Sequence, residues 1–261
     1  MARENILEMD NIVKQFPGVL ALDKVNISLR KGTILGLVGE NGAGKSTLIK
    51  ILSGVYPHGT YEGHIKINGE QRVFKNERES VSAGIAVIYQ ELMLFPELTI
   101  AENISMPTIS RIVNRDHMYS HALRWMKEVG LQENPETLIK NLGVGKQQLV
   151  EIAKVLSLEA KILILDEPTA ALTDRDTEHL LALLNELRQK GFSCIFISHK
   201  IREVLSVSDD ITVLRDGKVI GTNPVKELDD QKIIKMMVGR DMTNRFPPRP
   251  PAVNNEVIME V

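Results

Sequence analysis

The chain has 261 residues, and its 32 Lys and Arg nearly balance its 34 Asp and Glu, for a net charge of −2. With 43% hydrophobic and 25% charged residues, the composition is that of a globular protein and excludes extensive disorder. The small net charge argues against a nucleic-acid binder with a broad basic field. No apolar run exceeds five residues, too short to cross a bilayer, and the single cysteine excludes an intramolecular disulfide framework. The length, about 1.7 times a typical domain of ~150 residues, fits neither one domain nor two.

The first third of the chain alternates strand-like and turn-like segments. Alternating apolar and polar residues predict strands over residues 6–16 and 25–30. The apolar segment 33–38 predicts a strand buried on both faces, followed by a helix over 44–53. A hairpin around Asn68-Gly69 is expected to join strands at 64–68 and 72–74.

The middle third is predominantly helical between residues 100 and 158, most clearly over 116–129 and 146–156. The last third alternates again. Its predicted elements are strands at 161–165 and 193–197, helices at 175–190 and 200–207, and a hairpin of 211–214 with 219–220 around Asp216-Gly217. This order indicates an α/β core interrupted by a helical insert.

The strongest chemical signal is a glycine-rich segment between the strand at 33–38 and the next helix. It consists of Gly39, Glu40, Asn41, Gly42, Ala43, Gly44, Lys45, Ser46 and Thr47. The pattern matches a P-loop in its required strand–loop–helix context. Its glycines let backbone N–H groups approach phosphates, Lys45 neutralises phosphate charge, and the Ser46 hydroxyl is placed to bind Mg²⁺. A glycine-rich turn with an incidental Lys-Ser pair is the alternative, which the complete motif disfavours.

The second signal is an apolar strand that ends in two carboxylates, Asp166 and Glu167. The C-terminal ends of parallel strands border the ligand crevice of an open sheet. We therefore expect Asp166 on the metal side and Glu167 as the general base for an attacking water. Such a strand alone is more typical of a solvated turn, and the P-loop favours the catalytic interpretation. The sequence has no Asn-Lys-x-Asp guanine signature.

Together these motifs resemble the ATP-binding-cassette family over nearly the whole chain. The resemblance implies that Phe16 stacks on adenine, that Gln90 senses Mg²⁺ and water beside the helical insert, and that His199 contacts the γ-phosphate. Residues 168–173 occupy the D-loop position of the family. The family's ligands are ATP and Mg²⁺, with Ser46, Gln90 and Asp166 on the metal. Judged without the resemblance, Phe16 could be a core residue, Gln90 a surface residue and His199 structural.

Residues 167–173 and 197–204 resemble the ATPases of bacterial monosaccharide importers of the ribose, galactose and xylose type, in which two cassettes are fused. Residues 56–63 are similar to the xylose-type member. The resemblance implies an ATP hydrolase powering sugar import, as the N-terminal half of a tandem-cassette protein. Its expected partners are the second cassette in a head-to-tail dimer, a transmembrane permease docked around residues 91–104 and, indirectly, a sugar-binding protein, with no nucleic acid. It would work on the cytoplasmic side of the cell membrane, held there by the permease.

One motif departs from the family pattern. The segment Leu142-Gly143-Val144-Gly145-Lys146 stands where the family has Leu-Ser-Gly-Gly-Gln, or Leu-Ser-Val-Gly-Gln in the sugar branch. The serine hydroxyl that bonds the γ-phosphate of the opposite cassette is absent, and such a bond is worth about 1.5–3 kcal/mol. Gly143 and Gly145 still offer backbone N–H groups at a helix N-terminus, and Lys146 adds positive charge. We therefore expect one working and one weak site in the dimer.

Two other functions fit part of the sequence. A non-transport cassette ATPase would usually carry long coiled coils or basic arms, and neither is visible. A regulatory nucleotide-binding module would explain why the segment 142–146, the family's signature segment, departs from the pattern. Such a module would need neither Glu167 nor His199. Two further signals carry no function: His117 and His121 are expected on a solvated face, and Cys194 is expected to be an inert buried thiol.

The expected fold class is α/β, with a P-loop NTPase core, an N-terminal antiparallel β subdomain and a helical insert subdomain. The cassette is expected over residues 1–243, with its helical subdomain at about 92–160. A proline-rich, extended linker follows at 244–254. Residues 255–261 echo residues 5–10 and are expected to begin a truncated second cassette, which would explain the awkward length.

Overall fold

The computed structural model describes residues 4–108 and 114–239. The strands are β1 (Asn5–Phe16), β2 (Val19–Arg30), β3 (Ile34–Val38), β4 (Glu62–Ile67), β5 (Glu70–Arg72), β6 (Ile85–Ile88), β7 (Ile162–Asp166), β8 (Ser193–Ile197), β9 (Asp210–Arg215) and β10 (Lys218–Pro224). The α-helices are α1 (Lys45–Leu52), α2 (Glu77–Ser82), α3 (Ile100–Ser105), α4 (Arg115–Glu128), α5 (Val144–Leu156), α6 (Asp174–Gln189), α7 (Ile201–Val207) and α8 (Asp230–Val238). Short 3₁₀ helices cover Met106–Thr108, Ile139–Asn141 and Val225–Glu227.

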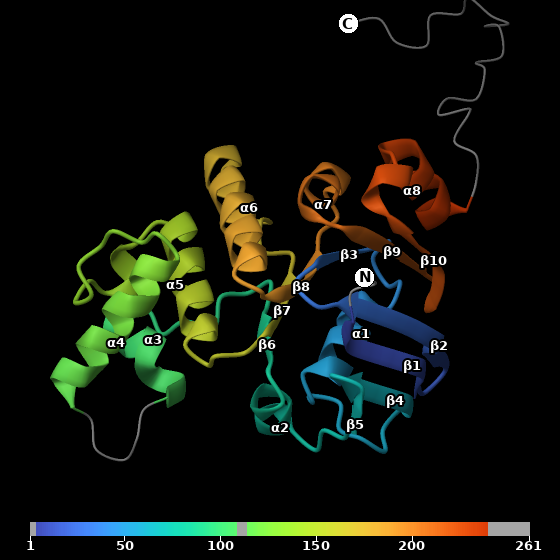
Figure 1. Cartoon of the computed structure of the whole chain (residues 1–261), viewed down its shortest axis with the longest axis horizontal. Coiled ribbons are helices and arrows are strands. Elements are labelled where there is room, and N and C mark those ends of the chain that lie inside the picture. The colour runs from blue at the N-terminus through green and yellow to red at the C-terminus, as the bar shows by residue number, and fades with distance from the viewer. Residues whose placement is uncertain (1–3, 109–113, 240–261) are drawn as a thin grey trace, which may run out of the picture.

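Two sheets organise the chain. The first is antiparallel, with strand order β2-β1-β4-β5, and the second has the order β10-β9-β3-β8-β7-β6. In the second sheet β9, β3, β8, β7 and β6 run parallel, and β10 pairs antiparallel with β9. Figure 1 shows α3, α4 and α5 as a separate group to one side of this sheet, with the antiparallel sheet on the other side. The predicted α/β core with an antiparallel N-terminal sheet and a helical insert is confirmed.

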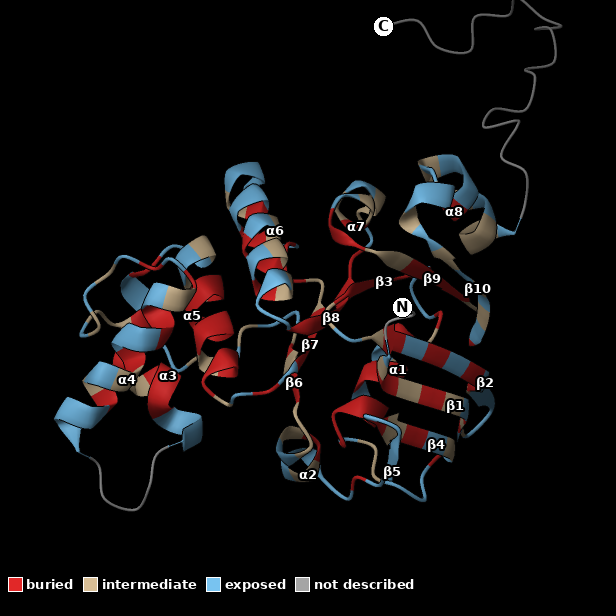
Figure 2. Cartoon of the chain, in the orientation of Figure 1, coloured by how far each residue is buried: buried red, intermediate tan, exposed pale blue. Residues whose placement is uncertain are grey.

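The parallel strands are covered on both faces, which is why they read as continuous apolar runs. Cys194 and Phe196 of β8 pack in the core that includes α5, α6 and α7, whereas Ile195 and Ile197 pack with α1 and the antiparallel sheet. All five residues of β3 and of β8 are buried. Figure 2 shows these strands in red across the middle of the molecule, while the outward faces of α4, α6 and α8 are exposed.

Most predicted elements are present, with boundaries within four residues, but β2 begins at Val19, six residues before the expected start. Helix α5 begins at Val144, two residues before the expected start, so its first turn includes Gly145 and Lys146. The second strand of the Asn68-Gly69 hairpin lies at 70–72 rather than 72–74. Helices α2 and α8 and strand β6 were not predicted individually. The expected linker at 244–254 and the second-cassette strand at 255–261 lie outside the described residues.

The lengths of the helices and the burial of Cys194 test two expectations from the sequence. Within the described ranges, no helix has both the length and the apolar character needed to cross a membrane. Cys194 is completely buried, and burial raises the pKa of its thiol to about 12. The thiol is therefore protonated at neutral pH, as the expected inert role requires.

Candidate functional site

The loop between β3 and α1 requires glycine where it approaches the rest of the molecule. A Cβ atom on Gly39 would lie 2.3 Å from the carbonyl oxygen of Leu214. Gly44 has a φ of +106°, and a Cβ there would lie 2.8 Å from the carbonyl oxygen of Ala21. The glycines thus let this loop pack directly against β2 and β9, with α1 starting immediately behind it.

Lys45, the first residue of α1, is buried beneath this loop. Only 7% of it is exposed, and its Nζ donates hydrogen bonds to the carbonyl oxygens of Gly39 at 2.7 Å and Glu40 at 3.0 Å. Burial lowers the pKa of Lys45, whereas the nearby carboxylates of Glu167 and Asp166 oppose that shift. The ammonium is therefore held at the inner surface of the loop, where it can meet phosphate oxygens.

Asp166 and Glu167 come from the C-terminal end of β7. Burial and the neighbouring Glu167 raise the pKa of Asp166. Glu167 adopts a φ of +48°, and its backbone N–H donates to the carbonyl oxygen of Ile197 at 2.9 Å. Because Asp166 and Ile197 are also register partners, the ends of β7 and β8 lie together.

His199 follows the end of β8 and contacts the base candidate directly. Its Nδ1 lies 3.0 Å from Glu167 Oε2, with 57% of the histidine side chain exposed against 16% of Glu167. The contact fixes the carboxylate on one side and leaves most of the imidazole facing outward. A histidine placed in this way can contact a group beyond Glu167.

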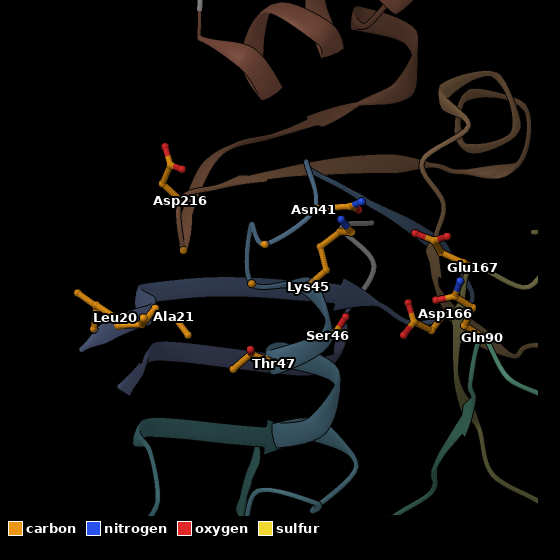
Figure 3. A pocket seen from close by; sticks show the side chains of 14 residues that line it. Leu20, Ala21, Asn41, Lys45, Ser46, Thr47, Gln90, Asp166, Glu167 and Asp216 are labelled. Atoms are coloured by element: carbon orange, nitrogen blue, oxygen red, sulfur yellow. The ribbon is translucent and has the colours of Figure 1, made fainter. Parts of the chain in front are cut away.

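These groups surround one cavity of about 560 Å³, shown in Figure 3. Its lining includes nine of the expected site residues: Asn41, Gly42, Gly44, Lys45, Ser46, Thr47, Gln90, Asp166 and Glu167. Gly39 and Glu40 reach the site through Lys45, Ala43 is buried within the loop, and His199 reaches it through Glu167. The structure thus gathers residues from four separate segments of the sequence.

The three residues expected to hold Mg²⁺ all line this cavity. They are Ser46, Gln90 and Asp166, which offer a hydroxyl, an amide and a carboxylate oxygen. Hard oxygen donors of this kind suit Mg²⁺, which usually takes few protein ligands and completes its shell with phosphate and water. The described residues hold no cluster of three His, Cys, Asp or Glu that could bind a metal.

Sequence reasoning missed one wall of the cavity. Val19, Leu20 and Ala21 of β2 line it together with the turn Asp216-Gly217 between β9 and β10. The Gly217 N–H donates to the carbonyl oxygen of Ala43 at 3.1 Å, which ties this turn to the loop. The hairpin at Asp216-Gly217 was predicted, but no local pattern connects it to a loop some 170 residues earlier. The consecutive apolar residues after Pro17-Gly18, exposed by 59% at Val19 and 48% at Leu20, were the available signal.

Phe16 is not among the residues that line the cavity. Its ring meets Tyr56 edge-on at 5.6 Å between centroids, and Lys14 Nζ lies 5.0 Å from its centre. Phe16 pairs with Val19 across the β1–β2 turn, so it stands next to the cavity wall and is half-buried rather than in the core. Stacking on adenine stays a prediction.

Gly143 and Gly145 lie away from this cavity, at the N-terminus of α5. Gly143 is the N-cap and makes no side-chain cap hydrogen bond. A Cβ on Gly145 would lie 2.6 Å from the carboxyl carbon of Asp176, so this glycine lets α5 and α6 approach. Lys146 forms an ion pair with Glu133. Within one chain, then, the signature segment does not meet the loop of Lys45.

His117 is exposed, as expected of a solvated face, whereas His121 is half-buried. Their rings stack with centroids 6.4 Å apart. His121 Nε2 accepts a hydrogen bond from Trp125 Nε1 at 3.2 Å. The His121 ring is therefore used in a hydrogen bond within α4.

Comparison with known proteins shows which proteins this chain is similar to. The family model described as ABC transporter matches residues 22–170. The chain is 58% identical over 245 residues to the xylose import ATP-binding protein XylG of Moorella thermoacetica, covering 93% of this chain and 49% of that protein. It is 55% identical over 263 residues to the L-arabinose transport ATP-binding protein AraG of Geobacillus stearothermophilus, covering 99% and 51%. The chain therefore spans about half the length of these curated relatives.

Solved structures agree. A nucleotide-free ATP-binding cassette from an ABC transporter superposes with a TM-score of 0.79 at 26% identity, covering 90% of this chain and all of that one. A dimeric bacterial ABC transporter cassette gives a TM-score of 0.73 at 26% identity, covering 84% and 98%. Because the family model covers more than half of the chain and these relatives are 55% to 58% identical to it, this chain belongs to the ATP-binding-cassette family of transporter ATPases.

Proposed function

We propose that this chain is an ATP-binding and ATP-hydrolysing cassette that powers the import of a monosaccharide through a membrane permease. The observation that carries the proposal is the single cavity in which Lys45, Ser46, Gln90, Asp166 and Glu167 converge. The names of the relatives, which import xylose or transport L-arabinose, support a pentose as the cargo.

The chain's own residues divide the chemistry between them. The loop of Gly39 to Ser46 and the N-terminus of α1 would bind the phosphates, and Lys45 would neutralise their charge. Mg²⁺, held by Ser46, Asp166 and Gln90, would supply charge neutralisation at the phosphates. Glu167 would take a proton from the attacking water, a role worth about 10²–10⁴ in rate. His199, in contact with Glu167 at 3.0 Å, would hold that carboxylate and meet the γ-phosphate.

The signature segment belongs to a second site. Because Gly143 and Gly145 lie away from the cavity, a complete site needs a second cassette, arranged head to tail, and the dimeric relative supports this arrangement. The second cassette would be the one fused to this chain in the intact protein. With the serine hydroxyl absent at Gly143 and Lys146 paired with Glu133, the site completed by this signature would be the weaker of the two.

The surface around residues 91–104 supports the expected docking of a permease. Met93 and Phe95, two positions apart in the sequence, are exposed by 58% and 53%, and exposed apolar side chains that gather on a surface are typical of interaction sites. Lys154 Nζ donates to the Met93 carbonyl oxygen at 2.6 Å, which joins this surface to α5. Docking there would hold the chain on the cytoplasmic side of the membrane, with a sugar-binding protein acting across it.

The test is ATP hydrolysis by the intact protein together with the membrane subunits that copurify with it. Addition of xylose or arabinose with the corresponding binding protein should raise the rate of Mg²⁺-dependent ATP hydrolysis in vesicles, and sugar should accumulate. Recovery of the intact protein without membrane subunits, with hydrolysis indifferent to every pentose, would contradict the transport role. Nucleotide binding with no turnover in any assembly would favour the regulatory module instead.

A further inference from the structure

Glu203, in the first turn of α7, contacts both loops that carry the reactive groups, although it does not line the cavity. Its Oε2 accepts hydrogen bonds from Thr169 Oγ1 at 2.6 Å and from Ser198 Oγ at 3.2 Å. Its Oε1 pairs with Lys200 Nζ at 3.0 Å. One carboxylate thus joins the segment after β7 to the segment after β8.

On the β8 side, Glu203 binds the two neighbours of His199. Ser198 is 2% exposed, and its Oγ also accepts from the Lys200 backbone N–H at 3.1 Å. His199 itself is mostly exposed, and its ring contacts Glu167. Because the flanking residues are fixed, the exposed histidine keeps its position without burying its ring.

On the β7 side, Glu203 binds the residue two positions after Glu167. Thr169 is 1% exposed, and its carbonyl oxygen accepts a second bond from Lys200 Nζ at 3.3 Å. Glu167 has a φ of +48°. Residues other than glycine hold this backbone conformation only where surrounding contacts impose it. The bonds at Thr169 are contacts of that kind.

The Glu203 side chain is 11% exposed, so water competes little for these bonds. We propose that Glu203 is a positioning residue for hydrolysis: it holds the loops of Glu167 and His199 in register so that the two side chains stay in contact. The inference rests on the proposed function, because it assigns Glu203 to the reaction at that site. Glu203 touches neither nucleotide nor water in this role and acts through Thr169, Ser198 and Lys200.

The test compares kcat for ATP with nucleotide affinity in the intact protein. Glu203→Gln removes the charge at nearly constant volume, so kcat should fall at least about tenfold, as expected when reacting groups shift by a fraction of an ångström. The Kd for Mg-ATP should stay within about twofold, because the phosphate-binding loop is untouched. In a Glu167→Gln background, Glu203→Gln should cause no further loss, since it acts through that side chain.

A matched pair at Thr169 keeps the test independent of folding. Thr169→Val removes the hydroxyl at constant shape and should lower kcat. Thr169→Ser keeps the hydroxyl, so its kcat should stay close to that of the wild type. Arg202→Gln, on the same helix but 92% exposed, serves as the control. Unchanged kcat in Glu203→Gln, or parallel losses of kcat, ATP affinity and melting temperature, would overturn the inference while leaving the proposed function standing. A wild-type intact protein with no ATP hydrolysis would overturn both.

Discussion

The N-termini of α1 and α5 are alike in local structure but differ in their surroundings. Their N-cap residues, Gly44 and Gly143, make no side-chain cap hydrogen bond. By contrast, α2, α3, α4, α6 and α8 are each capped by an Asn, Thr or Asp side chain. Of the α-helices in the described ranges, only α7, which begins just after His199, shares the absence of a side-chain cap. The two helices expected to meet phosphate therefore lack the internal acceptor that five of the other six described α-helices carry.

The residues around the N-termini of α1 and α5 indicate different roles for the two helices. At α1, the lysine is buried and bonds the loop, and Asp166 and Glu167 line the same cavity. At α5, Lys146 lies on the surface in an ion pair, and Val144 is 44% exposed. The first end is assembled within one chain, whereas the second presents backbone N–H groups to whatever docks on it. Substitutions at Glu167, Lys45, Gly143, Thr99 and Glu102 can break or sharpen this contrast.

The largest expected effect is at Glu167. Glu167→Gln keeps the shape and the approach to His199 but cannot accept the proton of the attacking water. Hydrolysis by the intact protein should fall by about 10²–10⁴, while nucleotide binding, measured by equilibrium fluorescence, is retained. Turnover equal to wild type would remove Glu167 from the role of base and leave the carboxylate of Asp166 to be tested next.

The next largest effect is expected at Lys45, whose replacement should weaken nucleotide binding. Lys45→Ala removes a buried ammonium, and hydrogen bonds to charged groups are worth about 1.5–3 kcal/mol, so nucleotide affinity at this site should fall by about 10- to 150-fold. Lys127→Ala, at an exposed position in the last turn of α4, is the control for charge alone.

The same substitution also tests the expected inequality of the two sites. Replacing the corresponding P-loop lysine of the second cassette in the intact protein should reduce ATP hydrolysis less than Lys45→Ala does. Equal losses from the two changes would contradict the hypothesis of one working and one weak site.

At the N-terminus of α5, substitution should change ATP hydrolysis less and should raise it rather than lower it. Nothing lies within 4 Å of a Cβ built on Gly143, so Gly143→Ser fits without strain and supplies the missing hydroxyl. If that hydroxyl bonds a phosphate of a partner cassette, hydrolysis at limiting ATP should rise by up to about tenfold, the lower end of a charged hydrogen bond. Gly143→Ala adds the same Cβ with no hydroxyl, and equal rates in the two variants would show that the added hydroxyl bonds no phosphate.

How far the sequence predicts this arrangement depends on how local the determinants are. The loop at Lys45 could be predicted because strand, glycines and helix are contiguous, and the Asp166-Glu167 pair because an apolar run leads directly to it. The wall formed by Leu20 and Asp216 could not, since it arises where two hairpins meet through the bond from the Asp23 N–H to the Gly217 carbonyl oxygen. The sequence likewise shows the positive charge of Lys146 but not the Glu133 carboxylate that pairs with it.

The smallest effect is at a capped helix and tests the other side of the contrast. At α3, the Thr99 side chain accepts from the Glu102 N–H, and the Glu102 carboxylate accepts from the Thr99 N–H and hydroxyl at 2.8 Å. Thr99→Ala should lower the free energy of unfolding by about 1 kcal/mol, measured by urea denaturation. Gly143→Ser, at an end without a side-chain cap, should cause no such loss. If both variants unfold like the wild type, the caps carry no stability and the contrast between the helix ends loses its energetic meaning.

The cap also has a defined pH dependence. The bonds from Thr99 lower the pKa of Glu102 below its ordinary value of 4.5. A lowered folded-state pKa stabilises the fold fully above the unfolded value, and this contribution is lost as pH falls through the folded value. The difference in unfolding free energy between wild type and Glu102→Gln should therefore be constant above about pH 5 and shrink below the ordinary pKa. A difference that grew on acidification would require Glu102 to be stabilised as the neutral acid, which the two donors at Thr99 do not favour.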